Sequence, residues 1–295
     1  MFKSFFLFLR VFLLAAAAIG SNAVADTGDP HIDLENIDSK ASLDWAREQN
    51  ARSLAELEKQ PEFAAMRREA LEILTSEARI PYGAVRGDHV FNFWQDKSHV
   101  RGILRRSSLA SYAAGKPDWE TLLDVVALDA SEKENWVYQS VECLAPDYLT
   151  CLIELSRGGT DASVYREFSI AQGRFVADGF VIPEAKSSVD WIDQDHLLVA
   201  TDWGPDSLTE SGYAKTLKIV ERGKPLAEAK TAYTGQSTDV SDQPLARRDR
   251  HRTYPFLLRA ISFFNYEYFL IGDDGALTAL PLPQRAGLEG VVDGR

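Results

Sequence analysis

The feature that most constrains the fold is a long succession of short apolar and aromatic stretches after Pro81. Each has the length and composition of a β-strand, and turn-forming residues separate one stretch from the next. No helical periodicity separates them, which favours hairpins over the strand–helix alternation of a parallel sheet. The stretches are 89–94, 99–106, 120–125, 135–144, 149–156, 163–170, 173–182, 187–193, 196–202, 214–223, 231–235, 266–272 and 276–282.

These strands contain an internal repeat. Residues 152–159 and 197–204 are both apolar stretches that end in a polar turn, and their first residues lie 45 positions apart. A spacing of about 45 suits one four-stranded blade of a β-propeller. Residues 156–161 then form a turn between two blade strands, where Gly158 and Gly159 supply backbone angles closed to other residues. The sequence predicts a mostly β fold: an incomplete β-propeller of about four to five blades.

Two helices are expected before the strands. Apolar residues recur at helical spacing from Leu43 to Leu57, with Ser39 as the N-cap. Pro61 breaks this helix and starts a second, whose apolar face runs from Phe63 to Leu74 and which ends at Pro81. We therefore expect a helical segment over 26–80 and the partial propeller over 81–295.

Residues 1–25 read as a secretory signal peptide that is cleaved after Ala25. Lys3 and Arg10 lead into an apolar run, and Ala23-Val24-Ala25 supplies the small residues of a cleavage site. The alternative is an uncleaved anchor, but Arg10 leaves the apolar run short. The mature chain has 30 basic and 44 acidic residues, a net charge of −14. This balance argues against nucleic acid and anionic membranes as partners. The signal peptide predicts a periplasmic or secreted protein.

The machinery of an enzyme is not found in the sequence. A hydrolase elbow needs G-x-S-x-G, and the best match, Gly235 followed by Ser237, has Asp239 in its last position. The five histidines are scattered without metal-ligand spacing, and residues 193–196 are interpreted as a turn. The Gly158-Gly159 pair lacks the rest of a phosphate-binding loop. We therefore name no catalytic, cofactor-binding or metal-binding residue, and expect no cofactor.

Cys143 and Cys151 are the two cysteines of the chain. The intervening Pro146-Asp147 signals a turn, so the two residues could face each other on neighbouring strands. A disulfide and a pair of buried free thiols both stay open here. The basic cluster of residues 247–252 is interpreted as a solvated loop.

Several segments together resemble the N-terminal part of the prolyl oligopeptidase family of serine peptidases, especially its exported bacterial members. The matches at the start of the mature chain are Asp29-Pro30, Leu34-Glu35, Trp45 and Gln49-Asn50. Longer matches are 91–106, 119–128, 155–168 and 179–204. The chain departs from the family pattern at His31 and Asp33, where an aromatic residue and a tryptophan are usual. The resemblance covers most of the mature chain.

The resemblance implies a seven-bladed propeller that covers an α/β-hydrolase domain carrying a Ser, Asp and His triad. The propeller would gate access of short peptides to that domain, and no position here matches the triad. The expected function is therefore the propeller portion of a serine endopeptidase, inactive alone. The expected partners are short peptides and a separately encoded catalytic domain. The alternatives are a stand-alone exported binding module and a non-functional gene remnant. An open ring would leave blade faces uncovered, so self-association is also expected.

Overall fold

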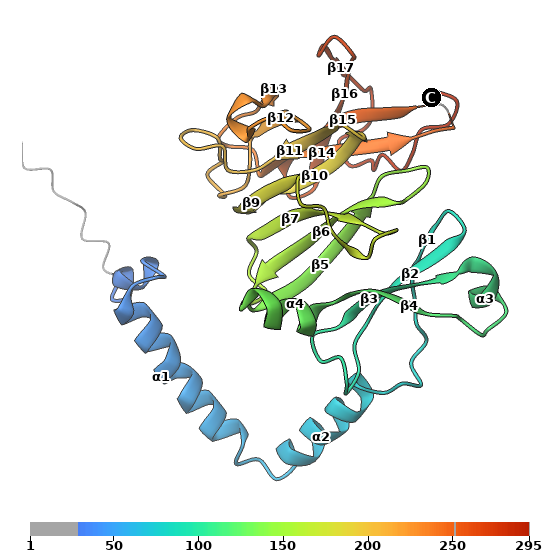
Figure 1. Cartoon of the computed structure of the whole chain (residues 1–295). Helices are drawn as coiled ribbons and strands as arrows, with labels where there is room; N and C mark the ends of the chain where they lie inside the picture. The colour runs from blue at the N-terminus through green and yellow to red at the C-terminus, as the bar shows by residue number, and fades with distance from the viewer. Residues whose placement is uncertain (1–28, 251, 295) are drawn as a thin grey trace, which may run out of the picture. The chain divides into compact units, whose positions relative to one another are not determined.

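A computed structural model describes residues 29–250 and 252–294 of the chain (Figure 1). The chain divides into two compact units between Ile73 and Leu74, and each unit is described by itself. The expected signal peptide, residues 1–25, lies outside the described residues. No helix within the described ranges is long and apolar enough to cross a membrane.

The first unit contains η1 (Ile32–Glu35), α1 (Lys40–Leu57) and nearly all of α2 (Phe63–Leu74). Ser39 caps α1 as expected, because its Oγ accepts a hydrogen bond from the Ser42 N–H at 3.1 Å. The apolar face predicted for α1 is largely exposed, with Leu54 at 50% and Leu57 at 52%. Packing in this unit therefore stabilises the helix little, and its capping and propensity matter more.

The second helix ends earlier than the sequence suggested. α2 stops at Leu74, well before Pro81. Beyond it, Ser76 Oγ accepts a hydrogen bond from the Ala78 N–H at 3.2 Å, and the Arg79 Nε donates to the Ser76 carbonyl at 2.9 Å. Such local side-chain bonds offer the backbone an alternative to the helix, which explains the early end.

The second unit consists of four antiparallel sheets (Figure 1). The first sheet holds β1 (Ala84–Arg86), β2 (His89–Trp94), β3 (Ile103–Ser108) and β4 (Glu120–Asp124). The second holds β5 (Trp136–Cys143), β6 (Thr150–Arg157), β7 (Ser163–Ser169), β8 (Arg174–Phe175) and β9 (Val181–Ala185), which pairs with β7. The third holds β10 (Ser188–Asp193), β11 (His196–Ala200), β12 (Thr216–Glu221) and β13 (Lys230–Thr234), with η2 (Leu226–Glu228) between the last two. The fourth holds β14 (Ser241–Arg248), β15 (Thr253–Ser262), β16 (Asn265–Ile271) and β17 (Leu277–Ala279).

This arrangement confirms the predicted fold class. Within the described residues there are four blade-like sheets after two helices, and the strands of each sheet pair in chain order apart from β9. The repeat seen in the sequence places Leu152 in β6 and Leu197 in β11, the second strands of consecutive sheets. The turn that follows β6 has Gly158 at φ 67° and Gly159 at φ 81°, the left-handed region that favours glycine.

Some elements of the second unit were not foreseen. Two short helices interrupt the strands, α3 (Leu109–Ala113) and α4 (Val125–Glu132). Asp124 starts α4 by accepting hydrogen bonds from the N–H groups of Val126 and Ala127. β14 and β15 were also missed, since Pro244 and Pro255 lie within them. Pro244 is tolerated because β14 is an edge strand of its sheet. The basic cluster is a loop only in part, because β14 extends to Arg248.

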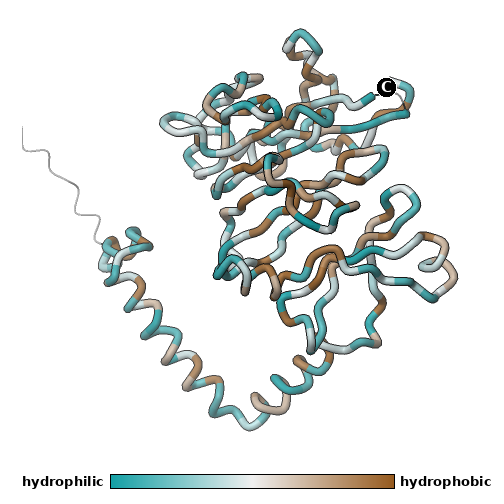
Figure 2. Tube along the Cα trace, in the orientation of Figure 1, coloured by the Kyte–Doolittle hydropathy of each residue, from teal (hydrophilic) through white to brown (hydrophobic). Residues whose placement is uncertain are grey.

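The inner strands are apolar without interruption because both of their faces are covered. On β11, Leu197 and Val199 pack against the second sheet, whereas Leu198 and Ala200 pack against the fourth. On β6, Leu152 faces the third sheet, and its neighbour Ile153 faces the first. Apolar residues accordingly follow the strands of the stacked sheets in Figure 2. A continuous apolar run in this chain therefore marks a strand between two sheets.

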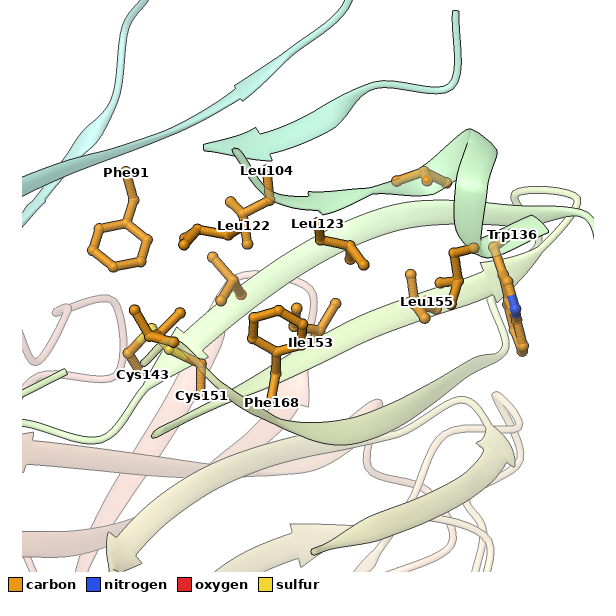
Figure 3. Packing of buried hydrophobic residues seen from close by; sticks show 14 of the residues in the cluster. Phe91, Leu104, Leu122, Leu123, Trp136, Cys143, Cys151, Ile153, Leu155 and Phe168 are labelled. Atoms are coloured by element: carbon orange, nitrogen blue, oxygen red, sulfur yellow. A yellow bond between two sulfur atoms is a disulfide. The ribbon is translucent and has the colours of Figure 1, made fainter. Parts of the chain in front are cut away.

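The most apolar interface lies between the first and second sheets. Leu104 and Leu123 of the first sheet meet Ile153 and Phe168 of the second, as Figure 3 shows. At one end of this cluster Cys143 and Cys151 form a disulfide, which joins directly opposed residues of β5 and β6. The structure thus decides between the two alternatives left open by the sequence.

The outward faces of the first and fourth sheets are partly filled by the chain itself. On the first, the Arg105 guanidinium lies 4.3 Å from the ring centroids of both Trp94 and Trp119. On the fourth, residues after β17 run along the sheet, and the Tyr268 hydroxyl donates to the Ala286 carbonyl at 3.1 Å. Tyr268 is 5% exposed.

Candidate functional site

The first strands of the four sheets, β1, β5, β10 and β14, contact one another in turn. The Arg86 guanidinium donates to the Val141 carbonyl at 2.7 Å. The Trp191 indole Nε1 donates to the Glu142 carbonyl at 3.1 Å, and the Ala246 N–H donates to Asp190 Oδ2 at 2.7 Å. These bonds bring one edge of every sheet to a common line, where a propeller has its axis.

Each first strand places one charged side chain at this line: Arg86, Glu142, Asp190 and Arg247, here called the first-strand row. Arg86 lies 4.0 Å from Glu142 and is the more buried of the two, with 15% of its side chain exposed against 54%. The charges do not alternate along the row: the carboxylates of Glu142 and Asp190 lie between the guanidinium groups of Arg86 and Arg247. It can therefore hold both charged ends of a small zwitterionic molecule.

The carboxylates of the row influence each other. Partial desolvation raises the pKa of Glu142, the charge of Asp190 raises it further, and Arg86 and Arg247 oppose the rise. Burial also raises the pKa of Asp190, against the hydrogen bonds from the Ala246 and Trp191 N–H groups and the charge of Arg247. Perturbed carboxyl groups gathered in one place are typical of binding sites.

Sequence reasoning did not find the first-strand row. Arg86, Glu142, Asp190 and Arg247 are isolated charges within strands, and nothing in their spacing predicts that they meet. The only signal available was a charged residue inside each short strand that begins a sheet. Long-range stacking of sheets brings them together, which a local pattern does not report.

The residues considered and set aside from sequence fall in turns, as interpreted. Asp193 ends β10, and its Oδ1 accepts the Asp195 N–H at 2.8 Å and contacts His196 Nδ1 at 2.9 Å. Over residues 29–250 and 252–294, no three His, Cys, Asp or Glu side chains are grouped in a way that could hold a metal ion.

Comparison with known proteins identifies the fold. The sequence model of the N-terminal β-propeller domain of prolyl oligopeptidase matches residues 17–254. The chain belongs to the prolyl oligopeptidase family. The resemblance inferred from the sequence is therefore confirmed.

Relatives of this family member agree with the assignment. The uncharacterized peptidase y4nA of Sinorhizobium fredii is 39% identical over 289 residues, 95% of this chain and 40% of the relative. The uncharacterized peptidase RP174 of Rickettsia prowazekii is 25% identical over 270 residues, 87% of this chain and 37% of the relative. The chain thus spans about 40% of the length of the curated relatives that it matches.

Solved structures give the same picture. A post-proline cleaving enzyme from Rickettsia typhi superposes with a TM-score of 0.80 at 25% identity, over 88% of this chain and 39% of that enzyme. Oligopeptidase B from Leishmania major superposes with a TM-score of 0.63 at 13% identity, over 87% of this chain and 35% of that protein. The second likeness shows the fold alone.

Proposed function

We propose that this chain is the N-terminal propeller portion of an exported prolyl-oligopeptidase-like serine endopeptidase, and that it gates the access of short peptides to a catalytic domain. The observation that carries the proposal is the first-strand row, which collects charged groups from all four sheets at one line. Membership of the family and the 40% coverage of y4nA support it.

The row gives the proposed gate a means of selecting peptides. A short peptide has an ammonium group, which would meet Glu142 or Asp190 in the middle of the row, and a carboxylate, which would meet Arg86 or Arg247 at either end of it. The opposite charges would attract both ends of a small peptide and favour it over molecules of other charge. Selection by size would come from the complete propeller that the family implies, and the row would add selection by charge.

A chimera tests the gate. This chain would replace the matching N-terminal part of y4nA, and kcat/KM would be measured for a short proline-containing peptide and a long one. We expect the chimera to prefer the short peptide. Substituting all four residues of the row with alanine should reduce that preference about tenfold, because interactions of charged groups with the peptide are lost.

The matched control is Lys224→Ala, which removes an exposed charge paired with Glu221 away from the row. Its preference should equal that of the parent chimera. Equal cleavage of short and long peptides by the parent chimera would contradict the gate. If the alanine variant kept the preference for the short peptide, the first-strand row would have no role in selection. The family assignment would not be affected.

The chain by itself is expected to be inactive. Nucleophilic attack on a peptide bond needs an activated serine, and the sequence matches no part of the family triad. Purified residues 26–295 should therefore release no product from proline-containing peptides. Turnover that a serine-directed covalent inhibitor abolishes would contradict this expectation.

Export is supported by the disulfide between Cys143 and Cys151, since disulfides persist in oxidising compartments. Expression of the full chain in a bacterium with a periplasm, followed by fractionation and N-terminal sequencing, tests it. We expect periplasmic protein that begins at Asp26. Protein that keeps residues 1–25 and stays in the cytoplasm would contradict export.

A further inference from the structure

Asp242 is a buried carboxylate that no hydrogen bond satisfies. It lies in β14 and is 1% exposed. Neither of its carboxylate oxygens has a hydrogen-bond partner among the described residues. A buried ionised group without a partner is costly. Ionisation of this side chain therefore favours any rearrangement that brings it a cation or water.

The cation that faces Asp242 across the sheet is engaged elsewhere. Arg259 stands opposite Asp242 in the register of β14 and β15. Its guanidinium donates to both oxygens of Asp239 at 2.9 Å and to Glu267 at 3.2 Å. Asp239 is itself 2% exposed. One arginine thus stands between two buried aspartates and binds only one of them.

The bound aspartate belongs to a short connection over Asp242, residues 235–240, here called the strap. The strap joins β13 to β14 and links the third sheet to the fourth. Its first residue lies against the buried carboxylate, since a Cβ at Gly235 would be 1.9 Å from Asp242 Oδ2. The bare glycine backbone therefore closes one side of the space that holds the carboxylate.

The strap is held by polar contacts rather than by apolar packing. None of its residues belongs to the buried apolar clusters of the described chain, and residues 236–238 are exposed. The Gly235 N–H donates to the Lys215 carbonyl at 2.7 Å. The paired hydrogen bonds of Arg259 with Asp239 are charge-assisted and form its strongest anchor. A segment held in this way opens at a lower free energy than the strands beside it.

From this arrangement we infer that the strap is controlled by pH through Arg259. While Asp242 is neutral, Arg259 binds Asp239 and holds the strap closed. When Asp242 ionises, it competes for the guanidinium, Asp239 is released and the strap opens. Directly opposed residues of antiparallel strands have Cβ atoms about 5 Å apart, so Arg259 reaches Asp242 without a change in register. The strap does not depend on the proposed gate.

The direction of the pH dependence follows from the protons bound in each form. Burial, and then the charge of Asp239, raise the pKa of Asp242 to about 7, while Arg259 opposes the rise. In the open form the carboxyl is hydrated, with an ordinary pKa of about 4. Between these values the closed form binds one proton more than the open form. The opening constant should therefore rise about tenfold per pH unit and level off above pH 7.

Other titratable or charged groups surround Asp242. They are Tyr233 of β13, Asp239 of the strap, Arg259 of β15, Glu267 of β16, and Asp161, Lys186 and Tyr213 beside a neighbouring cavity. Burial would raise the pKa of Asp239, but hydrogen bonds from Arg259 and the Gln236 N–H lower it, so Asp239 stays ionised. Burial and the charge of Asp242 raise the pKa of Tyr233, which stays neutral.

The test is amide hydrogen exchange of the full mature chain between pH 5 and pH 8, corrected for the intrinsic exchange rate at each pH. Fragments that contain Gly235 and Val240 report on the strap, and fragments of β6 report on global unfolding. From pH 5 to pH 7 the opening constant of the strap should rise about hundredfold. The strap should exchange faster than β6 throughout. A strap that exchanges as slowly as β6, or whose opening constant does not change with pH, would overturn the proposal.

Two variants with a matched control separate the roles of the aspartates. Asp242→Asn cannot ionise, so its strap should stay closed at pH 7 as it does at pH 5. Asp161→Asn removes a carboxylate whose side chain is 74% exposed, and it should follow the parent chain. A hundredfold rise that persists in Asp242→Asn would overturn the proposal.

The second variant keeps the test decisive if Asp242→Asn does not fold. Asp239→Asn releases Arg259 to Asp242 at every pH in this range. Its strap should exchange at pH 5 at least as fast as that of the parent at pH 7, and the rate should no longer depend on pH. An Asp239→Asn strap that stays closed at pH 5, or that keeps the pH dependence of the parent, would show that Arg259 does not exchange between the two carboxylates.

Discussion

The interface between the first and second sheets differs from that between the third and fourth. The first has the larger apolar cluster, with Phe168, Ile153 and Leu155 fully buried and a disulfide at one end. The last has a smaller apolar cluster around Leu257, and beside it lies the buried carboxylate of Asp242. The same stacking of sheets thus produces one interface built for stability and one that keeps uncompensated charge.

The difference between the two interfaces shows which part of the stability depends on pH. Apolar burial contributes about 25 cal/mol per Å² and does not depend on pH. A buried carboxylate lowers stability whenever it is ionised, and a protein keeps it at little benefit to folding. The two interfaces should therefore respond differently to truncation, to pH and to reduction.

The largest effect is expected from Phe168→Ala in the first interface. Phe168 is 0% exposed, and its removal leaves a cavity among Ile153, Leu104 and their neighbours. The free energy of unfolding should fall by about 3–5 kcal/mol, measured by urea denaturation. Phe263→Ala, at a residue that is 75% exposed, is the control and should change it by less than about 0.5 kcal/mol. Similar losses in both would contradict the comparison.

The second effect belongs to the last interface and appears as pH dependence. The pKa of Asp242 is raised from 3.8 to about 7 by burial, so the folded chain binds more protons than the unfolded chain between these values. The free energy of unfolding should therefore fall as pH rises from about 4 to about 7, by up to about 4 kcal/mol from this carboxyl group.

Asp242→Asn should remove this part of the pH dependence. Denaturation of the parent and the variant across pH 4 to 8 measures it, and the variant should gain on the parent as pH rises. Asp161→Asn is the control and should follow the parent. Parallel curves for the parent and Asp242→Asn would show that the carboxylate is stabilised in the folded chain.

Removal of the disulfide should have an intermediate effect. Cys143 and Cys151 are separated by 8 positions, and closing so short a loop stabilises the folded state by about 2–3 kcal/mol. Cys143→Ala with Cys151→Ala should lower the free energy of unfolding by this amount, and a reducing agent should do the same to the parent chain. The reducing agent should leave the double variant unchanged. A parent chain insensitive to reduction would contradict the pairing.

The smallest effect is expected at Gly235, beside Asp242. A Cβ at this position would lie 1.9 Å from Asp242 Oδ2, so the carboxylate must shift. Gly235→Ala should cost about 1–3 kcal/mol in thermal or urea unfolding. Gly290→Ala is the control, because a Cβ there meets nothing within 4 Å. The cost should shrink in an Asp242→Ala background, and a cost that persists there would mean that the clash lies elsewhere.

Much of the fold was predictable from local pattern. Strand length, turn residues and the 45-residue spacing gave the hairpins and the blades, and Ser39 marked the start of α1. Local pattern failed where short-range bonds compete with it. Asp124 caps α4 after an apolar stretch that resembled a strand. Ser76 forms a local hydrogen bond just after α2, and the helix therefore ends well before Pro81. Proline within β14 and β15 hid two strands: β14 tolerates its proline as an edge strand, whereas β15 lies between β14 and β16.

The candidate sites were not predictable in the same way. Arg86 and Arg247 lie far apart in the chain, and Asp242 sits one residue into an unremarkable strand. Nothing in the sequence distinguishes them from the other charges of an acidic protein. Their surroundings depend on which sheets pack together and on which carboxylate pairs with each arginine.

The sequence by itself determined the family, the hairpins and the repeated unit, because period-two strands and turn chemistry act over a few residues. Tertiary structure alone decided that Cys143 pairs with Cys151, that the first strands share a line, and that Arg259 binds Asp239 rather than Asp242. The physical reason is that charge compensation and desolvation depend on distances between residues remote in sequence. These distances are set only when the sheets are packed.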